Sequence, residues 1–473
     1  MPSRDAGRVA GTDFTWAIFR LGCAAIMNAP PPTSPPSAVR VKHPILWVPT
    51  SYFSMGTIYM TITLVTTIMY KNLGMADEDA AFWASALGFP YVIKFLWAPL
   101  LEMFGTKKIF VVTSQLGIAA LFVAIAIALK LPAFVPITLA LLFVAAFLGA
   151  TQDVGADGVY VTALNRKDQA RFTGFQSLCW SIGPIFASGV LVRFSGTFHK
   201  RGMDWADSWQ LICFVIAATV GVLSLYHLKM MPPGDKAKDA PKSVSDAATT
   251  MVDTFRTLFE KKGIWLMLSF AFLYRFGQGL LDKIGPLFMM NDRAAGGLGL
   301  SNELLGDING TYGMIGFLLG GLLGGFFVAK NGLSTKLLFF LCCMMNIPNA
   351  TYIYLGTAQP ESALFIGTIV TLEKFGFGFG AVGHMIYMMQ QLAPGKYRTA
   401  HYAIGTALMG FCMMFTGMVS GHIAKALGSY TAYFWFVMVA TIPSFVVTWL
   451  APFHVKDDQA AGDEADSETA AAA

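Results

Sequence analysis

The sequence has little charge: Asp, Glu, Lys and Arg make up 13% of its 473 residues, roughly half of the ~25% found in an average soluble protein. Apolar residues make up 55%, and the mean hydropathy is +0.56. So few charged residues could not cover that much apolar surface in water, which excludes a disordered chain, a coiled coil and an ordinary cytosolic enzyme. The basic residues are scattered over loops, so no nucleic-acid partner is expected.

The sequence also lacks the motifs of metal sites and active sites. Its six cysteines show no CxxC or metal-ligand spacing, so we interpret them as small core residues and expect no metal or other cofactor. There is no HExxH, no GxSxG and no nucleophile with a base beside it in the sequence. The protein is therefore not expected to be an enzyme, and a membrane-embedded acyl or lipid transferase is kept only as an alternative.

What the chain has in abundance is long apolar runs. Crossing a bilayer takes about 20 predominantly apolar residues, and twelve segments meet this requirement. They lie at about 45–70, 80–101, 109–129, 133–163, 172–195, 208–230, 263–290, 304–329, 335–356, 361–392, 399–424 and 430–452. The sequence therefore predicts an all-α polytopic membrane protein with twelve transmembrane helices.

A polar gap at 231–262 divides these segments into six and six. It begins with Pro232 and Pro233, and its end, Thr250–Lys262, predicts a short amphipathic helix on the membrane surface. We therefore expect a six-helix bundle at 42–230, a cytoplasmic linker at 231–262 and a second six-helix bundle at 263–454. The tails at 1–41 and 455–473 are expected to be disordered, and Met27 is an alternative to Met1 as the first residue.

Lysine and arginine indicate the orientation of the segments. When both termini are placed in the cytoplasm, the inner loops carry more of these residues than the outer loops, as the positive-inside rule requires. An even number of spans agrees with this arrangement. We expect a monomer that is surrounded by the lipid bilayer and has both termini in the cytoplasm.

Charged side chains lie inside several of the apolar segments, where each costs about 2.5–3.5 kcal/mol even on insertion scales. The segment 133–163 contains Asp153 and Asp157, next to Gln152. The two acids share one helix face and repel when both are ionised, so one of them suits uptake and release of a proton. The alternatives are a static pair neutralised by Lys94 and a gate contact near the cytoplasm, which the late position of Asp157 favours.

The segment 263–290 carries Arg275, Gln278, Asp282 and Lys283. The first three lie on one helix face, and an arginine in the middle of the membrane suits bidentate binding of an anionic or hydroxyl-rich ligand. The alternative for Arg275 is an internal ion pair with Glu373 or Asp282. Asp282 has Lys283 beside it, which indicates a fixed pair.

The segment 361–392 carries Glu373, Lys374 and His384. Glu373, Phe377 and His384 fall near one helix face, where a carboxylate and an imidazole suit a proton relay. The alternative for His384 is a hydrogen-bonded packing residue. The run 373–380 alternates phenylalanine with glycine, which suits either stacking on sugar rings or close contact between helices.

These residues fall into three predicted roles. Candidates for the wall of a substrate cavity are Tyr52, Tyr59, Gln152, Arg275, Gln278, Phe377 and Tyr387. Candidates for proton coupling are Asp153, its rival Glu373, and His384, which could extend either route. Candidates for gating or fixed ion pairs are Lys94, Asp157, Asp282, Lys283 and Lys374.

Several stretches resemble the AmpG-type permease family of the major facilitator superfamily. They are Tyr91–Lys108, Gly149–Leu164, Thr399–Gly410 and the pattern Glu373-x-Phe375-Gly376-x-Gly378. The resemblance spans roughly 42–453 and implies two six-helix bundles whose first, fourth, seventh and tenth helices line a central cavity. It also implies proton-driven import of an amino-sugar, oligosaccharide or muropeptide-like solute across the inner membrane, with another organic solute as the alternative. The positions that match by motif are Lys94, Gln152, Asp153 and Asp157.

Overall fold

The computed structural model describes residues 43–102, 106–234 and 243–453. The tails predicted at 1–41 and 455–473 lie outside these residues, as does part of the predicted linker. The described residues form helices joined by short connections, with no strand among them. Eleven of their helices are long and apolar enough to cross a membrane.

The helices before residue 231, here called the N-bundle, include the first of these spans at Pro44–Asn72. A π-helical turn, η2 (Thr61–Val65), interrupts it. The elements of the N-bundle are η1 (Pro44–Leu46), α2 (Val48–Met60), η2, α3 (Thr66–Asn72), α4 (Asp77–Ala86), α5 (Phe89–Ile93), η3 (Lys94–Leu96), α6 (Ala98–Glu102), α7 (Lys107–Ala128), α8 (Phe134–Ala163), α9 (Arg166–Pro184), η4 (Ile185–Leu191), α10 (Val192–Lys200) and α11 (Trp205–Met230).

The helices after residue 263, here called the C-bundle, contain more interruptions. The elements are α13 (Ile264–Leu273), α14 (Phe276–Met290), η5 (Arg293–Ala295), α15 (Asn302–Leu305), η6 (Gly306–Tyr312), α16 (Gly313–Asn331), α17 (Thr335–Asn346), η7 (Ile347–Ala350), α18 (Thr351–Ala358), α19 (Ala363–Tyr387), η8 (Met388–Leu392), α20 (Arg398–Leu427), α21 (Tyr430–Ala440) and α22 (Ile442–Leu450). The break in the first span of this bundle places Arg275 at the N-terminus of α14.

One expected span, the second in chain order at 80–101, is missing from the eleven long helices. It is present instead as four short pieces, α4, α5, η3 and α6. Pro90 and Pro99 explain the breaks, because a proline has no N–H for the helix ladder and clashes with the preceding turn. The fold of two six-span bundles is thus as predicted, but one span is jointed rather than continuous.

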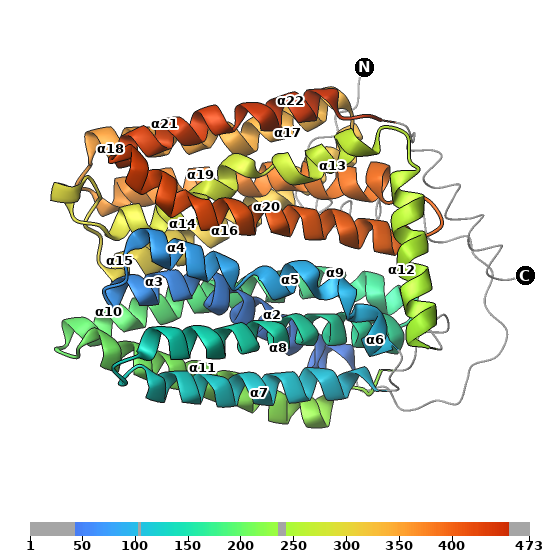
Figure 1. Cartoon of the computed structure of the whole chain (residues 1–473), viewed down its shortest axis with the longest axis horizontal. Coiled ribbons are helices and arrows are strands. Elements are labelled where there is room, and N and C mark those ends of the chain that lie inside the picture. Colours follow the sequence, from blue (N-terminus) through green and yellow to red (C-terminus); the bar gives the residue numbers. More distant parts are fainter. Residues whose placement is uncertain (1–42, 103–105, 235–242, 454–473) are drawn as a thin grey trace, which may run out of the picture. The chain divides into compact units, whose positions relative to one another are not determined.

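A transverse helix, α12 (Val244–Phe259), lies in the linker between the bundles. It begins before the predicted Thr250 because the side chain of Ser243 accepts a hydrogen bond from the Asp246 N–H and caps the helix there. Figure 1 shows α12 running across the ends of the helices of both bundles. This end of the helices is called the α12 end below.

The opposite end is closed by polar contacts between the bundles. Asn302 donates to the Asn72 side chain at 2.7 Å and to the Ser195 hydroxyl at 2.9 Å. The other contacts join Asp77 to Asn291 and Tyr430, Glu78 to Lys425, and Arg193 to Asp307. This end is called the closed end.

Glycines let the backbones of η4 and η6 touch at the closed end. A Cβ atom on Gly310 would lie 2.1 Å from the Ser188 carbonyl oxygen, and one on Gly306 would lie 2.6 Å from the Gly189 carbonyl oxygen. Such distances are impossible for a real side chain against backbone, so only glycine allows this approach. The closed end therefore depends on small residues as much as on hydrogen bonds.

We expect Gly310→Leu to force η4 and η6 apart. Overpacking of this kind costs about 1–3 kcal/mol, enough to shift the protein toward conformations in which the closed end is open. The measurement is the rate at which a membrane-impermeant maleimide labels Ser195→Cys in a chain that is otherwise free of cysteine, since Ser195 is fully buried. Gly325→Leu, also in the span that contains η6 and α16, is the control because its Cβ would meet nothing within 4 Å. Equal labelling of the two variants would contradict the prediction.

Candidate functional site

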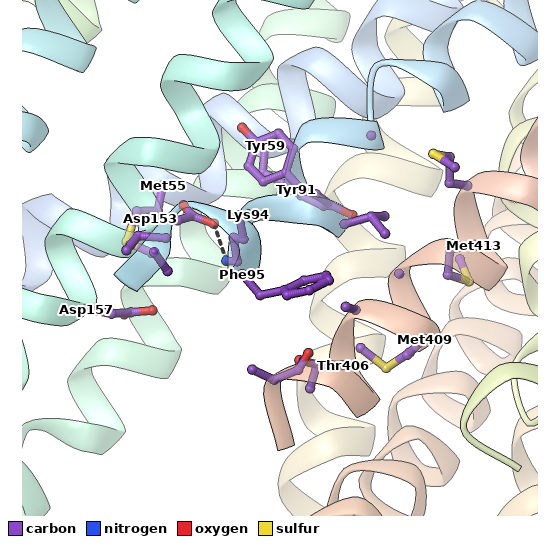
Figure 2. Close-up of a pocket in the computed structure, with 18 of the residues that line it drawn as sticks. Met55, Tyr59, Tyr91, Lys94, Phe95, Asp153, Asp157, Thr406, Met409 and Met413 are labelled. Carbon is purple, nitrogen blue, oxygen red and sulfur yellow. Dashed lines mark hydrogen bonds and ion pairs between the residues drawn. The ribbon is translucent and has the colours of Figure 1, made fainter. Parts of the chain in front are cut away.

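A cavity of about 1270 Å³ lies between the N-bundle and the C-bundle. Its walls come from α2, η2, the pieces α4 to α6, α8 and α9 on one side, and mainly from α20 on the other. Figure 2 shows the two sides facing each other, with Asp153 and Lys94 opposite Thr406 and Met409. Its size lies above the range of about 300–1,000 Å³ that is typical of small-molecule sites.

Two carboxylates lie on the N-bundle wall, one helical turn apart on α8. Lys94 donates to Asp153 Oδ2 at 3.2 Å, and the Tyr52 hydroxyl donates to Asp157 Oδ1 at 2.7 Å. Lys94 belongs to η3, between the two prolines of the jointed span. The predicted pair of Lys94 with an acid of α8 is therefore present, and all four of these predicted site residues line the cavity.

Gln152 does not line the cavity, which corrects its predicted placement. It is fully buried on another face of α8, and its amide donates to the Ser54 hydroxyl at 3.2 Å. Gln115 donates to the same hydroxyl at 3.1 Å, and His227 pairs with Gln115 at 2.9 Å. This network joins four helices of the N-bundle behind the wall and fixes the rotation of α8.

Aromatic side chains flank the carboxylates. Tyr59 meets Tyr91 edge to face, with ring centroids 5.0 Å apart, and lies 6.3 Å from Trp180. Tyr59 was a predicted cavity residue, whereas Tyr91 and Trp180 were not, although both line the cavity. Polar residues stand near both rings, Lys94 after Tyr91 and Gln176 before Trp180, but our sequence reasoning did not use them to place these rings on the cavity wall.

The C-bundle wall is a stripe of small and flexible residues on α20. Ala400, Ala403, Ala407, Gly410 and Met414 line the cavity at spacings of three and four residues, which is one face of a helix. This periodic stripe was the sequence signal for the wall, and our sequence reasoning missed it. The wall therefore presents apolar, adaptable contacts opposite the polar face of α8.

The ion pair predicted between Asp282 and Lys283 is also on the wall. Their side chains are 2.7 Å apart, and both line the cavity. Among the residues that the structure describes, no three acids, histidines or cysteines are arranged to hold a metal ion.

The tenth span contributes nothing to the cavity wall, which corrects the expectation for Glu373, Phe377, His384 and Tyr387. Its glycines pack directly on neighbouring backbones: a Cβ on Gly378 would lie 2.0 Å from the Phe317 carbonyl oxygen. The glycines of the run 373–380 therefore serve close contact between helices, which was one of the two alternatives for this run. Glu373 is fully buried and pairs with Lys374 at 3.4 Å.

His384 and Tyr387 pack inside the C-bundle. The imidazole of His384 lies 5.4 Å from the ring of Phe270 and 4.9 Å from that of Tyr274. The Tyr387 hydroxyl donates to the Pro452 carbonyl at 2.8 Å. Gln278, also a predicted cavity residue, is fully buried and does not line the cavity.

Arg275 makes neither of the two ion pairs that were considered for it. Glu373 is taken by Lys374 and Asp282 by Lys283, and no carboxylate of the described residues lies within 4 Å of the guanidinium. The guanidinium instead stands over the ring of Phe377, 5.6 Å from its centroid. Phe377 in turn packs on Phe317, a wall residue, so Arg275 lies one layer behind the wall.

The helix α12 forms the floor of the cavity. Thr250, Met251 and Phe255 line it, and the ring of Phe255 meets that of Phe95 in the N-bundle. Toward the C-bundle, His401 Nε2 lies 3.1 Å from both the Thr254 carbonyl oxygen and the Thr257 hydroxyl. Thus α12 contacts both bundles at the end opposite the closed one.

Comparison with known proteins adds a family to this geometry. A sequence profile described as Major Facilitator Superfamily matches residues 49–400. The chain is 24% identical over 396 residues to an "Anhydromuropeptide permease" of Escherichia coli K12, which covers 82% of this chain and 76% of that protein. It is equally similar, at 24% over 391 residues, to an uncharacterized protein of Haemophilus influenzae, with 78% and 86% covered.

A solved structure shares the fold. The crystal structure of the nucleoside transporter NupG superposes with a TM-score of 0.65 at 16% sequence identity and covers 87% of this chain and 99% of that one. At this identity the likeness concerns the arrangement of the helices alone.

We expect His401→Ala to loosen α12, because the hydrogen bond that Nε2 shares between the Thr254 carbonyl and the Thr257 hydroxyl is lost. Such a bond is worth about 1 kcal/mol, so amide hydrogens of α12 should exchange about fivefold faster, while those of α14 stay unchanged. Thr249→Ala is the matched control, since its exposed hydroxyl bonds only to the Ser245 carbonyl within α12. Unchanged exchange of α12 in His401→Ala, measured by mass spectrometry, would show that this contact does not hold the helix.

Proposed function

Because the chain belongs to the Major Facilitator Superfamily, we propose that it is a proton-coupled importer of an amino-sugar, oligosaccharide or muropeptide-like solute. It is a multi-pass membrane protein and a secondary transporter of small-molecule solutes. The observation that carries the finer proposal is the pair of carboxylates, Asp153 and Asp157, on the wall of a large cavity closed at one end. No enzymatic activity is proposed.

The transporter works by alternating access in the inner membrane, as a monomer with both termini in the cytoplasm. The helix α12 lies in the linker, which is cytoplasmic in the proposed orientation. The cavity, which reaches α12, therefore lies toward the cytoplasmic end. The contacts of Asn302 and Gly310 at the closed end separate when the protein opens outward, and the α12 end then closes. The excess of lysine and arginine in the inner loops supports this orientation.

The solute binds between a polar, aromatic wall and an adaptable apolar one. The rings of Tyr59, Tyr91 and Trp180 offer faces for the C–H surface of sugar rings. Hydroxyl groups of the solute find partners in Asp153, Asp157 and Lys94. The size of the cavity supports a solute larger than one sugar ring.

Asp153 is the proton-coupling residue. A coupling group must be reached from the cavity, and the side chain of Asp153 is 13% exposed whereas that of Glu373 is fully buried. When Asp153 is ionised it holds Lys94; when it takes up a proton, that attraction ends. The ammonium is then left with Asp157, the other acid in its electrostatic range.

The exchange of partners by Lys94 moves a jointed element. Lys94 lies in η3, which together with α5 contacts α20 of the C-bundle. Val92, two residues earlier, packs against Gly410, where a Cβ would lie 3.5 Å from its methyl group. Protonation at Asp153 therefore acts on a contact between the bundles through a segment that its prolines leave flexible.

We expect Asp153→Asn to abolish accumulation of solute driven by a pH gradient while retaining exchange of solute for solute. An amide keeps the shape of the side chain but cannot gain or lose a proton. The assay compares uptake driven by a pH gradient with counterflow in proteoliposomes, using a panel of amino sugars, chitooligosaccharides and anhydro-muropeptides. Glu373→Gln is the matched variant and should keep both activities.

Two results would contradict this assignment. Accumulation by Asp153→Asn against a solute gradient would show that Asp153 is not the coupling group, and its loss in Glu373→Gln alone would move the role to the rival residue. Failure of the wild-type protein to exchange any member of the panel would contradict the proposed solute class.

A further inference from the structure

The wall of the cavity carries one more acid than it has bases. Among the residues that the structure describes, its charged side chains are Lys94, Asp153 and Asp157 on the N-bundle side and Asp282 and Lys283 on the C-bundle side. Asp282 and Lys283 are 2.7 Å apart and compensate each other. The surplus negative charge therefore belongs to the N-bundle side.

Other charges of the C-bundle lie behind the wall and do not touch a solute in the cavity. Arg275 stands over the ring of Phe377, which packs on the wall residue Phe317. Glu373 and Lys374, paired at 3.4 Å, do not line the cavity either. The charges that a solute contacts directly are therefore those of the wall alone.

Asp157 holds the surplus charge. Lys94 donates to Asp153 at 3.2 Å, whereas Asp157 accepts from the uncharged Tyr52 hydroxyl at 2.7 Å. No lysine or arginine nitrogen of the described residues lies within 4 Å of the Asp157 carboxylate. The side chain is exposed on the cavity wall, and Figure 2 shows its carboxylate directed toward the side where Thr406 lies. A solute in the cavity therefore meets an acid that no cation contacts.

Uptake of a proton by Asp153 removes the surplus. In the proposed transport cycle, this step leaves Lys94 with Asp157, and the wall then has as many charged acids as bases. An ion inside the membrane is costly unless an opposite charge compensates it. A carboxylate on a solute that enters with the proton would restore the excess of negative charge, and an ammonium group would produce an excess of positive charge.

The remaining polar groups of the wall are uncharged hydroxyls and an amide, which can exchange hydrogen bonds with the hydroxyl and acetamido groups of a sugar. They include Gln176, Ser177, Ser181, Thr250, Thr399 and Thr406. From the charge balance and these groups we infer that the transported solute is an uncharged, N-acetylated amino sugar or oligosaccharide, and neither a free amine nor a muropeptide with a carboxylate. This inference rests on the proposed function and narrows its solute class.

The test compares three disaccharides that share two sugar rings and differ in charge. N,N′-diacetylchitobiose is uncharged, chitobiose carries two ammonium groups, and N-acetylglucosaminyl-N-acetylmuramic acid carries one carboxylate. Counterflow of each labelled disaccharide, and of its one-ring counterpart, is measured in proteoliposomes at slightly acidic pH. We expect the uncharged compounds to reach half-saturation at concentrations about tenfold lower than the charged ones, because a charge that faces its like or has no partner costs at least that much.

Two variants should shift this preference in opposite directions. Asp157→Asn keeps an oxygen that accepts from Tyr52 but leaves Lys94 without an acid when Asp153 is protonated, so the compound with the carboxylate should gain about tenfold relative to the uncharged one. Lys94→Gln removes the cation instead, so chitobiose should gain. Lys94→Arg keeps the charge and should keep the wild-type ranking, which separates the effect of charge from that of altered packing.

Glu361→Gln and Arg201→Gln are the matched controls, because each removes one charge from an exposed loop residue that does not line the cavity. Both should show the wild-type ranking.

The inference is overturned if a charged compound is exchanged as well as its uncharged counterpart in the wild type, or if Asp157→Asn and Lys94→Gln leave the ranking unchanged. Exchange of the charged compounds alone would overturn the inference but leave the proposed transport of amino-sugar solutes intact. Absence of counterflow with every compound in the wild type would instead overturn the proposed function, and the inference with it.

Discussion

A charge inside the bilayer must have a compensating partner, and this constraint explains the interior of the protein. Lys94 pairs with Asp153, Lys283 with Asp282 and Lys374 with Glu373. Two of these pairs join adjacent residues of one helix, and the pair of Lys94 with Asp153 joins η3 to α8. The cost of burial is therefore offset within one bundle. The bundles can then move relative to each other without breaking most of these pairs, and only the ones on the cavity wall remain open to exchange.

Small residues determine which faces can be cavity and which must be contact. The glycines of η6 and of the tenth span bring backbones together, as at Gly310 and Gly378, and leave no room for a solute. The alanines of α20 do the opposite, because they face the open space and widen it. Small residues thus close one end of the protein where a neighbouring backbone packs against them, and they enlarge the cavity where no neighbour does.

Breaks in the membrane helices lie beside the charged residues of the interior. Pro90 and Pro99 divide the second span around Lys94, and α14 starts afresh at Arg275. At the α12 end, the link between the bundles is a helix held by His401 on one side and by aromatic contact on the other. A change in the partner of Lys94 can therefore reach the contact between the bundles through short, adjustable segments.

The sequence predicted the fold well and the cavity in part. Apolar length and the polar gap located the spans, because burial in lipid leaves so clear a pattern; only the jointed second span differed. The pairing of Lys94 with an acid of α8 followed from the cost of lone charge. The burial of Gln152, His384 and Tyr387 away from the cavity could not be predicted from the sequence, because a polar residue in a span can face a buried network as easily as a cavity. Tyr91 and Trp180 were missed because our sequence reasoning did not use the polar residues near them.

Protonation of Asp153 within the cavity is the central claim, and infrared difference spectroscopy tests it most directly. Lowering the pH should produce the C=O band of a newly protonated carboxylic acid in the wild-type protein reconstituted in lipid. We expect one component of this band to be missing in Asp153→Asn and retained in Glu373→Gln. A band that is identical in the wild type and in Asp153→Asn would contradict the assignment of Asp153 as the group that carries the proton.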